Sequence, residues 1–420
     1  IPTKALVHSG TVFETVKSAL KFGVSAEQVS LDMEKVMKHK QSTVDQLVLG
    51  IERLLKGNGV EILSGWAKIV SPGQGEVAFS DDSKQVLSTK NIIIATGSSS
   101  FNLPFLEGKT VSSDEMLSLD CVPERLAIVG GGVIGIEFAS IFAAFGSKVT
   151  VIELLPAILP NIDSEIAQRL TLILKKKGIS INTSTSVTEI KAENNEKIVL
   201  AKAKDGTVKE FRCDLVLSAV GRVPNFGGID LDGLGVSYDR KGIKTDDRMA
   251  TNVQGIWAIG DVVGRTQLAH GASAEGIVAA ENIFGQTKTI DYTVVPACVF
   301  SIPGCSGVGL TEKEAQEKGF AVKVSKFPFS ANGKAISMGE TDGLVKAVAD
   351  ETTGKLLGMH ILGAHSDDLI HEGAIAIKAG LTAQDVADTI HAHPTLSEAA
   401  MEAFLGVSGS QIHMVSRRPR

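Results

Sequence analysis

Three groups of residues in this sequence have side chains and spacings that could support catalysis or cofactor binding. The first is HAHPTLSEA, where a proline that favours a helix start lies between His393 and Glu398. Imidazole transfers protons near neutral pH, and a carboxylate on its second nitrogen fixes the tautomer and stabilises the imidazolium. A structural interpretation fits equally well, because Thr395 and Glu398 have the spacing of a helix capping box. Both interpretations predict the two side chains at one helix N-terminus, with His391 as a structural neighbour.

The second group is a glycine pattern that follows a strand-like segment and opens a helix-like one. Gly130 permits a tight turn, Gly132 lets the backbone approach a pyrophosphate, and Gly135 lets the helix pack closely on the strand. The phosphates would lie at the helix N-terminus, which Val133 and Ile134 begin. The pattern therefore predicts a dinucleotide site.

Glu153 indicates which dinucleotide this site prefers. It ends the strand-like segment 148–153, about twenty residues after the glycine turn, where a carboxylate can accept from a ribose 2′-hydroxyl. The following residues, 154–162, include no Arg or Lys that could hold a 2′-phosphate. The sequence therefore predicts NAD rather than NADP.

The third group surrounds Asp261, which follows the strand-like segment 256–260. A carboxylate at the C-terminal edge of a sheet can bind a ligand hydroxyl, although an isolated Gly-Asp pair is more simply explained as a turn. The helical pattern that starts near His270 continues with the small residues 271–273, which allow close approach. Its positive N-terminal end would stabilise the charge of a reduced flavin, so the two features together suggest a flavin site.

Hydrophobic patterning predicts the elements that carry these groups. Helical periodicity covers about 12–58 and an amphipathic helix covers 164–177. The design of a buried strand running into a glycine turn occurs at 90–100 and again at 214–225, which suggests two related α/β domains. From residue 291 the pattern changes to strands followed by helices of small residues, typical of an α+β domain.

Composition excludes several classes of protein. A chain of 420 residues should hold two or three domains, and its net charge of −6 argues against a nucleic-acid partner. Its basic clusters are 175–177 and the tail 417–420, which we interpret as a frayed end. The apolar stretch 127–146 is interrupted by Glu137 and glycines, so it predicts a strand, a turn and a buried helix rather than a membrane span.

The cysteines suggest neither a metal site nor a local redox pair. They contain no CxxC and no metal-ligand spacing, so the sequence predicts no bound metal. We predict four buried cytosolic thiols: Cys121, Cys213, Cys298 and Cys305.

The sequence resembles the dihydrolipoamide dehydrogenases, which are FAD-dependent members of the pyridine nucleotide-disulfide oxidoreductases. The motifs that carry the resemblance occur in the family's order over essentially the whole chain: IPTKAL, IIATGS, IVGGGVIGIEFAS, VGRVPN, IWAIGDVVG, LAHGASAEG, VGLTE and HAHPTLSEA. The last motif is the most specific, because relatives with other substrates match it less closely.

The resemblance implies an α/β fold of two Rossmann-like dinucleotide-binding domains with a C-terminal α+β dimerisation domain. The FAD domain would cover 1–117 and 247–288, with an inserted NAD domain at 118–246 and the interface domain at 289–420. It also implies oxidation of protein-bound dihydrolipoyl groups, in which a substrate dithiol reduces an enzyme disulfide, electrons pass to FAD, and NAD⁺ takes hydride.

The implied partners are a second copy of the chain and lipoyl proteins. The lipoyl proteins would be the lipoyl domains and acyltransferase core of 2-oxo acid dehydrogenase complexes, or the lipoyl protein of glycine cleavage. The expected location is the cytoplasm, and a mitochondrial or plastid matrix stays open.

The resemblance also implies roles for single residues. His393, held by Glu398, would be the acid/base that serves the partner subunit's disulfide, and Lys4, paired with Glu137, would lie by the flavin N5 region. Asp261 would bind the ribityl chain. Further implied contacts are Thr96, Gly97, Leu268, Ala269 and His270 for FAD, and Gly221 and Arg222 for NAD.

The chain departs from the family pattern at the redox site. The family has a first GxGxxG unit for FAD and then a CxxxxC whose second cysteine precedes the segment matching IPTKAL, and this sequence contains neither. Cys298 and Cys305 have the wrong spacing, while Cys121 and Cys213 belong to the NAD region. We therefore expect a fragment whose FAD sheet lacks its central strand, and which alone holds little FAD and shows no lipoamide activity.

Two other functions stay open. One is a related FAD/NAD(P) oxidoreductase, such as a soluble transhydrogenase or a glutathione- or mercury-reducing relative. The other is a non-catalytic truncated subunit that keeps dimerisation and scaffold binding. Glu153 argues against the NADPH reductases, and the lack of a cysteine beyond Cys305 argues against a C-terminal metal-binding thiol pair.

Overall fold

The fold is known from a computed structural model that describes residues 1–194 and 196–415. The basic tail 417–420 lies outside the described residues. No helix in the part that is described has the length and apolar character needed to cross a bilayer.

The chain forms two compact units, each built from separate segments. Unit 1 contains Ile1–Val44, Asn102–Val220 and the described residues from Thr293 onward. Unit 2 contains Asp45–Phe101 and Gly221–Tyr292.

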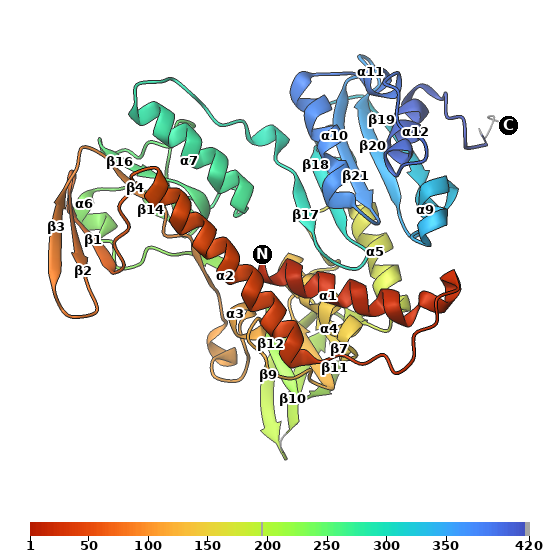
Figure 1. Ribbon diagram of the computed structural model, residues 1–420, viewed down its shortest axis with the longest axis horizontal. Coiled ribbons are helices and arrows are strands. Elements are labelled where there is room, and N and C mark those ends of the chain that lie inside the picture. Colours follow the sequence, from red (N-terminus) through yellow and green to blue (C-terminus); the bar gives the residue numbers. More distant parts are fainter. Residues whose placement is uncertain (195, 416–420) are drawn as a thin grey trace. The chain divides into compact units, whose positions relative to one another are not determined.

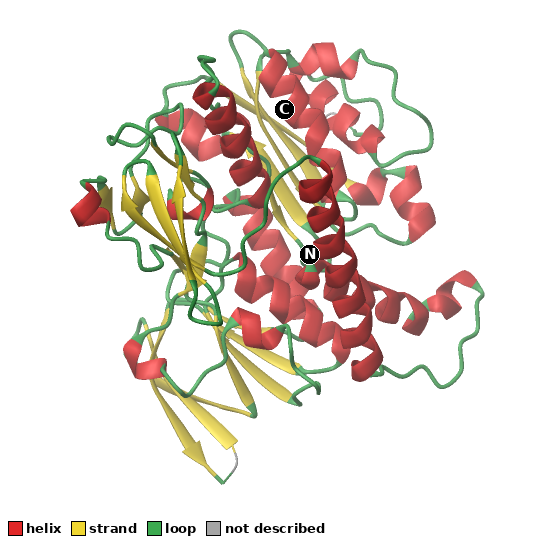
Figure 2. Cartoon of the chain, turned by 60° about the vertical axis from the view of Figure 1, so that its left-hand side comes forward, coloured by secondary structure: helices red, strands yellow, loops and turns green. Residues whose placement is uncertain are grey.

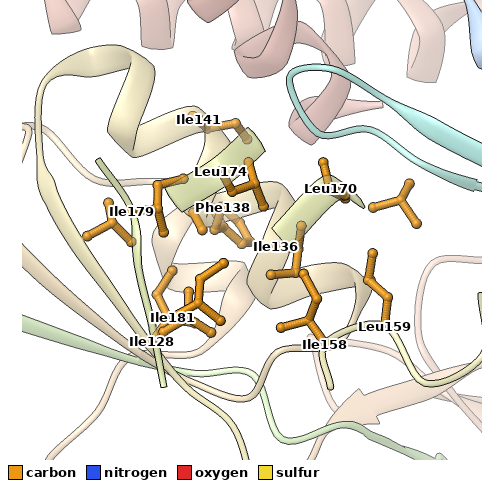
Figure 3. Close-up of a cluster of buried hydrophobic side chains, with 14 of the residues drawn as sticks. Ile128, Ile136, Phe138, Ile141, Ile158, Leu159, Leu170, Leu174, Ile179 and Ile181 are labelled. Carbon is orange, nitrogen blue, oxygen red and sulfur yellow. The ribbon is translucent and has the colours of Figure 1, made fainter. Parts of the chain in front are cut away.

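Unit 1 contains a four-stranded parallel sheet in the order β12-β6-β7-β8. The first strand in sequence runs into a glycine turn and a helix buried on nearly all sides, as the pattern of 127–146 predicts. Isoleucine, leucine and phenylalanine side chains from the sheet and its two helices form the core (Figure 3). The elements are β6 (Arg125–Val129), α4 (Val133–Phe145), β7 (Lys148–Ile152), α5 (Ser164–Lys176), β8 (Ser180–Asn182) and β12 (Leu215–Ser218).

An antiparallel three-stranded sheet is inserted between β8 and β12. Its order is β11-β10-β9, so consecutive strands are neighbours. The strands are β9 (Thr185–Glu193), β10 (Glu196–Ala203) and β11 (Val208–Cys213).

The C-terminal part of unit 1 is a five-stranded antiparallel sheet in the order β17-β18-β21-β20-β19. Helix α10 packs on β21 and β18, and helix α12 packs on β19 and β20 (Figures 1 and 2). This confirms the predicted strands followed by helices. The elements are β17 (Ala297–Val299), β18 (Cys305–Gly309), α8 (Glu312–Glu317), β19 (Val322–Pro328), α9 (Gly333–Met338), β20 (Leu344–Asp350), β21 (Leu356–Leu362), α10 (Ser366–Ala379), α11 (Ala383–Ala387) and α12 (Ser397–Ser408).

The helical pattern predicted over about 12–58 corresponds to two long helices with an irregular connection between them. Helix α1 (Pro2–Lys17) begins with proline at its first turn, and Gly10 lets it approach Ala144 of α4. A short 3₁₀ turn then ends at Gly23, whose φ of +79° stops the helical path, and α2 (Met33–Gly57) starts only after an irregular connection.

Unit 2 is built from small sheets. Strands β4 and β16 form a parallel pair, while β5 pairs antiparallel with β13. The segment 90–100 is less buried than predicted, since β4 spans only three residues and Ile93 is 40% exposed. The elements are β1 (Trp66–Ser71), β2 (Gln74–Ala78), β3 (Lys84–Ser88), β4 (Ile92–Ile94), β5 (Ser98–Ser100), β13 (Arg222–Pro224), α6 (Leu231–Leu234), β14 (Tyr238–Asp239), β15 (Gly242–Ile243), β16 (Ile256–Ala258), the 3₁₀ turn η3 (Gly260–Val262) and α7 (Ala269–Ile283).

Candidate active site

The structure brings the predicted histidine and glutamate together in unit 1. His393 Nδ1 lies 2.9 Å from Glu398 Oε1, and the His393 side chain is 79% exposed. Glu398 Oε2 also accepts from the Thr395 N–H at 2.8 Å. Partial burial would raise the pKa of Glu398, but the bonds from Thr395 and His393 lower it below its usual value. The carboxylate therefore stays ionised and holds one ring nitrogen of an exposed imidazole.

The local geometry supports only half of the capping-box interpretation. Thr395 Oγ1 donates to the Ala392 carbonyl at 2.7 Å, so residues 392–396 form a turn before the helix. The helix α12 begins at Ser397 with Leu396 as its N-cap, and that cap makes no side-chain hydrogen bond. The helix begins three residues after Pro394, so His393 and Glu398 meet beside one helix N-terminus, as predicted.

His391 lies on the inner side of the same loop. Its Nδ1 is 2.7 Å from the Thr389 carbonyl oxygen, and its Nε2 is 3.5 Å from Glu372 Oε2. Its side chain is only 8% exposed and borders a cavity of about 430 Å³ that Ile375 and Leu381 also line. These contacts fit the interpretation of His391 as a structural neighbour.

The glycine turn has the geometry of a phosphate-binding site. Side chains at Gly130 and Gly135 would collide with the carbonyl oxygens of Ala219 and Gly130, whereas a side chain at Gly132 would enter open space. Gly132 is the N-cap of α4 and offers no side-chain cap, so the helix N-terminus is open to an anion. Val133 and Ile134 form the first turn, and Val133 is 41% exposed. The residues present therefore fit the pyrophosphate of a dinucleotide.

Glu153 is joined to this turn. Its Oε2 accepts from the Gly131 N–H at 2.5 Å and its Oε1 from the Leu155 N–H at 2.6 Å. The side chain is almost fully buried at the C-terminal end of β7. Each carboxylate oxygen can accept more than one hydrogen bond, so a ribose hydroxyl can still bind there.

The structure also forms the pair between Lys4 and Glu137 that the resemblance implies. Lys4 Nζ lies 3.3 and 3.4 Å from the two carboxylate oxygens of Glu137, which is 5% exposed. Glu137 Oε1 accepts a second bond from the Phe300 N–H at 3.0 Å, and Lys4 Nζ lies 4.2 Å from the centroid of the Phe300 ring. A buried carboxylate thus fixes a half-exposed ammonium group.

The predicted flavin residues of unit 2 lie on neighbouring strand ends. Asp261 is in η3, just beyond the end of β16, and its Oδ2 accepts from Ser98 Oγ at 2.6 Å. Thr96 Oγ1 donates to the Asn225 carbonyl at 2.5 Å, and Gly97, with φ of +70°, turns the chain into β5.

The helix α7 begins close to the predicted position in unit 2. Leu268 is its N-cap without a side-chain hydrogen bond, and Ala269 and His270 open its first turn. A carboxylate and an uncapped helix N-terminus are the groups that fit the hydroxylated chain and the anionic reduced ring of a flavin.

The two remaining NAD predictions fall in unit 2, whereas the glycine turn belongs to unit 1. Gly221 has φ of +129° and precedes β13. Arg222 directs its guanidinium to Ser98 and Ser100 on β5.

The cysteines are not poised for disulfide exchange. The prediction that all four are buried is confirmed for Cys213 and Cys305, whereas Cys298 is only partly buried and Cys121, in the turn that leads into β6, is exposed. Burial raises the pKa of Cys213 to about 11 and that of Cys305 to about 12, and also raises the pKa of Cys298. Such thiols are poor nucleophiles near neutral pH. Among the described residues, no three His, Cys, Asp or Glu side chains are arranged to hold a metal ion.

Sequence reasoning missed Glu275, a buried carboxylate beside the proposed flavin residues. It is 1% exposed, accepts from the Gly260 N–H at 2.5 Å, and takes a 2.7 Å bond from the Tyr292 hydroxyl. These bonds fix the peptide that precedes Asp261. In the sequence, Glu275 could have been noticed as a charged residue among the small residues of the helix at 269–283.

Comparison with known proteins gives consistent matches over almost the whole chain. Residues 1–276 match the family described as pyridine nucleotide-disulphide oxidoreductase, and residues 295–404 match the dimerisation domain of that family. The chain is 42% identical to a dihydrolipoyl dehydrogenase of Bacillus subtilis, covering 98% of this chain and 90% of the relative. It is 40% identical to the dihydrolipoyl dehydrogenase of Geobacillus stearothermophilus, covering 99% and 89%.

Solved structures give the same fold. The Cu(II) complex of the HOCl-induced flavoprotein disulfide reductase RclA from Escherichia coli superposes with a TM-score of 0.85 at 29% identity, covering 96% of this chain and 89% of that one. LpdA from Mycobacterium tuberculosis superposes with a TM-score of 0.88 at 23% identity, covering 97% and 89%, and supports the fold alone.

Proposed function

The chain belongs to the pyridine nucleotide-disulphide oxidoreductase family, whose cofactors are FAD and NAD, and from this we propose that it is a dihydrolipoyl dehydrogenase. The proposed reaction oxidises protein-bound dihydrolipoyl groups with NAD⁺. The observation that carries the proposal is the exposed pair of His393 and Glu398, in a chain 42% identical to a dihydrolipoyl dehydrogenase.

The proposed role of His393 is to accept the proton of a substrate thiol. Because ionised Glu398 accepts from Nδ1–H, the ring presents its Nε2 lone pair to the solvent-exposed side. Once protonated, the imidazolium is stabilised by the same carboxylate, which is 20% exposed. The pair therefore has the tautomer, charge and exposure that a general base requires.

The other proposed roles concern the cofactors. When bound, FAD and NAD⁺ supply the electron and hydride transfers. We propose that the glycine turn and Glu153 hold NAD, that Thr96, Gly97, Asp261 and α7 hold FAD, and that Lys4, fixed by Glu137, is a cation of the flavin site. Gly221 remains a proposed contact of NAD.

The domain boundaries predicted from the sequence remain part of the proposal. They give an FAD domain at 1–117 and 247–288, an NAD domain at 118–246 and an interface domain at 289–420. The parallel sheet of unit 1 falls within the second of these domains, and the five-stranded sheet falls within the third.

The dimerisation-domain match supports a homodimer. We propose a lipoyl-bearing partner, from a 2-oxo acid dehydrogenase complex or glycine cleavage, and a cytoplasmic location.

The test uses the protein isolated from its natural source, because none of the four cysteines supplies a redox pair. We expect a visible flavin absorbance and NADH formation that depends on both dihydrolipoamide and NAD⁺. A preparation that holds flavin but forms no NADH from dihydrolipoamide and NAD⁺ would contradict the proposal.

A second candidate is a related FAD/NAD(P) oxidoreductase without a disulfide, such as a soluble transhydrogenase. Such an enzyme needs no cysteine pair, and the four cysteines of this sequence are all free thiols. Hydride exchange between NADPH and an NAD⁺ analogue, in the absence of any thiol, would distinguish this candidate.

We expect the carboxylate of Glu153 to determine the preference for NAD⁺ over NADP⁺. The carboxylate repels a 2′-phosphate, so we expect kcat/KM for NAD⁺ to exceed that for NADP⁺ by a wide margin. In Glu153→Gln, loss of the charge should reduce this ratio by about tenfold, which corresponds to about 1.4 kcal/mol. Glu189→Gln, on the exposed face of β9, is the matched control. An unchanged ratio in the Glu153 variant would exclude this role.

A further inference from the structure

We propose that Arg222 is a positioning residue of the flavin site, acting on Asp261 through the hydroxyl of Ser98. This inference rests on the proposed function, since it assumes that Asp261 binds flavin. All three residues lie in unit 2, on β13, on β5 and in η3.

Three hydrogen bonds attach Arg222 to β5. Its Nε donates to Ser98 Oγ at 2.8 Å, its Nη2 to the Ser98 carbonyl at 2.7 Å, and its Nη1 to Ser100 Oγ at 3.4 Å. The strands β13 and β5 are paired, with Arg222 opposite Ser100. A planar guanidinium with donors in a fixed fork matches this set of acceptors, which a lysine ammonium could not reproduce.

The Ser98 hydroxyl accepts a hydrogen bond from Arg222 and donates one to Asp261. A serine hydroxyl carries one proton, so an oxygen that accepts from Arg222 Nε–H is free to use that proton as a donor. Ser98 Oγ donates it to Asp261 Oδ2 at 2.6 Å. The chain therefore runs from a cation through a hydroxyl to a carboxylate, and each bond polarises the next.

The bond from Ser98 orients the carboxylate of Asp261. Oδ2 is bound by Ser98, which restricts the rotation of the carboxylate, so the proposed acceptor for a ligand hydroxyl is Oδ1. The main chain before Asp261 is held separately, by the bond from the Gly260 N–H to Glu275. Arg222 and Ser98 thus orient the side chain, while Glu275 fixes the backbone.

This arrangement changes the expected consequence of altering Arg222. As a contact of NAD, its loss would weaken nucleotide binding. Since three of its donors are directed to β5, we expect its loss to weaken FAD binding instead.

The experiment measures FAD and NADH dissociation constants separately. Apoprotein of the natural protein and of its Arg222→Met, Ser98→Ala, Asp261→Asn and Arg222→Met/Asp261→Asn variants is titrated with FAD, and flavin fluorescence is followed. NADH binding is measured by the quenching of NADH fluorescence. Arg240→Met, on the exposed turn between β14 and β15, is the matched control.

We expect the FAD dissociation constant to rise about tenfold in Arg222→Met and in Ser98→Ala, with the NADH constant unchanged. The FAD dissociation constant of the double variant should exceed that of Asp261→Asn by less than twofold, because Arg222 acts through the Asp261 carboxylate. A merely structural role would give additive effects. Ser98→Ala removes only one oxygen, so it tests the inference even if Arg222→Met fails to fold.

Three results would overturn the inference: unchanged FAD binding in both single variants, a rise in the NADH constant instead, or additive effects in the double variant. If the unaltered protein itself bound no FAD, the proposed function would fail together with the inference. If it bound FAD and the variants matched it, only the inference would fail.

Discussion

Replacing His393 by glutamine should lower kcat for the oxidation of dihydrolipoamide by NAD⁺ by about 10²- to 10⁴-fold, the contribution of a positioned general base. Glutamine keeps much of the size of the side chain but cannot accept and release a proton. The measurement is steady-state NADH formation by the variant and by the unaltered protein, prepared in the same way. Electron transfer from NADH to an artificial acceptor should stay within about twofold, because that reaction requires no base for a thiol.

The chain offers a matched control for this variant, a histidine whose glutamate partner lies on the same helix, α12. His413 Nδ1 lies 2.7 Å from Glu402 Oε1, a second histidine and glutamate pair with 65% exposure of the imidazole. His413→Gln should leave the dihydrolipoamide reaction within about twofold of the unaltered protein. Equal losses in the two variants would mean that the effect of His393→Gln is structural, and full activity in His393→Gln would remove it from the mechanism.

The features that the sequence predicts well are local in the chain. The glycine turn and Glu153 belong to one βαβ unit, so their spacing alone indicates how they meet. Likewise His393 and Glu398 are close in sequence, although spacing could not decide between catalysis and capping. The structure forms the Glu398 half of a capping box, through the bond from the Thr395 N–H to Oε2, and places the N-cap of α12 at Leu396. The His393→Gln variant is therefore what distinguishes the two roles.

The features that spacing cannot predict join residues far apart in the chain. Lys4 and Glu137 are 133 positions apart, and only the resemblance suggested their pairing. Ser98 and Asp261 are 163 positions apart, and no periodicity relates one to the other. Periodicity over 12–58 also does not show where one helix stops and the next begins, which in the structure happens at Gly23 and the connection after it.

The largest effect on stability is expected from Lys346→Met, which should lower the free energy of unfolding by about 3–5 kcal/mol. The Lys346 side chain is 2% exposed on β20, and its Nζ lies 3.0 Å from Asp163 Oδ2 and 2.9 Å from Glu312 Oε2. Asp163 is equally buried and caps α5 through the Glu165 and Ile166 N–H groups. Removing the cation leaves this carboxylate buried without its charge partner.

The check is the midpoint of thermal unfolding, which should fall by about 10 °C for a destabilisation of this size. Lys323→Met, at an exposed position on the neighbouring strand β19, is the control and should change stability by no more than about 0.5 kcal/mol. If Lys346→Met melted within a degree of the unaltered protein, the buried pair would not be stabilising.

The stability difference between the unaltered protein and Lys346→Met should also depend on pH in a defined way. Burial alone would raise the pKa of Asp163, but its charged and hydrogen-bonding neighbours lower it overall. Ionised Asp163 therefore contributes its full stabilisation of the folded state above its unfolded pKa of about 3.9. This stabilisation is lost as pH falls through the lower pKa of the folded state. Burial would lower the pKa of Lys346, yet Glu312 and Asp163 raise it overall, so its contribution is present below about pH 10.4 and is lost above its folded value. The difference should thus be largest on the plateau between these limits and shrink in strong acid, and a difference that grew in acid would contradict this assignment.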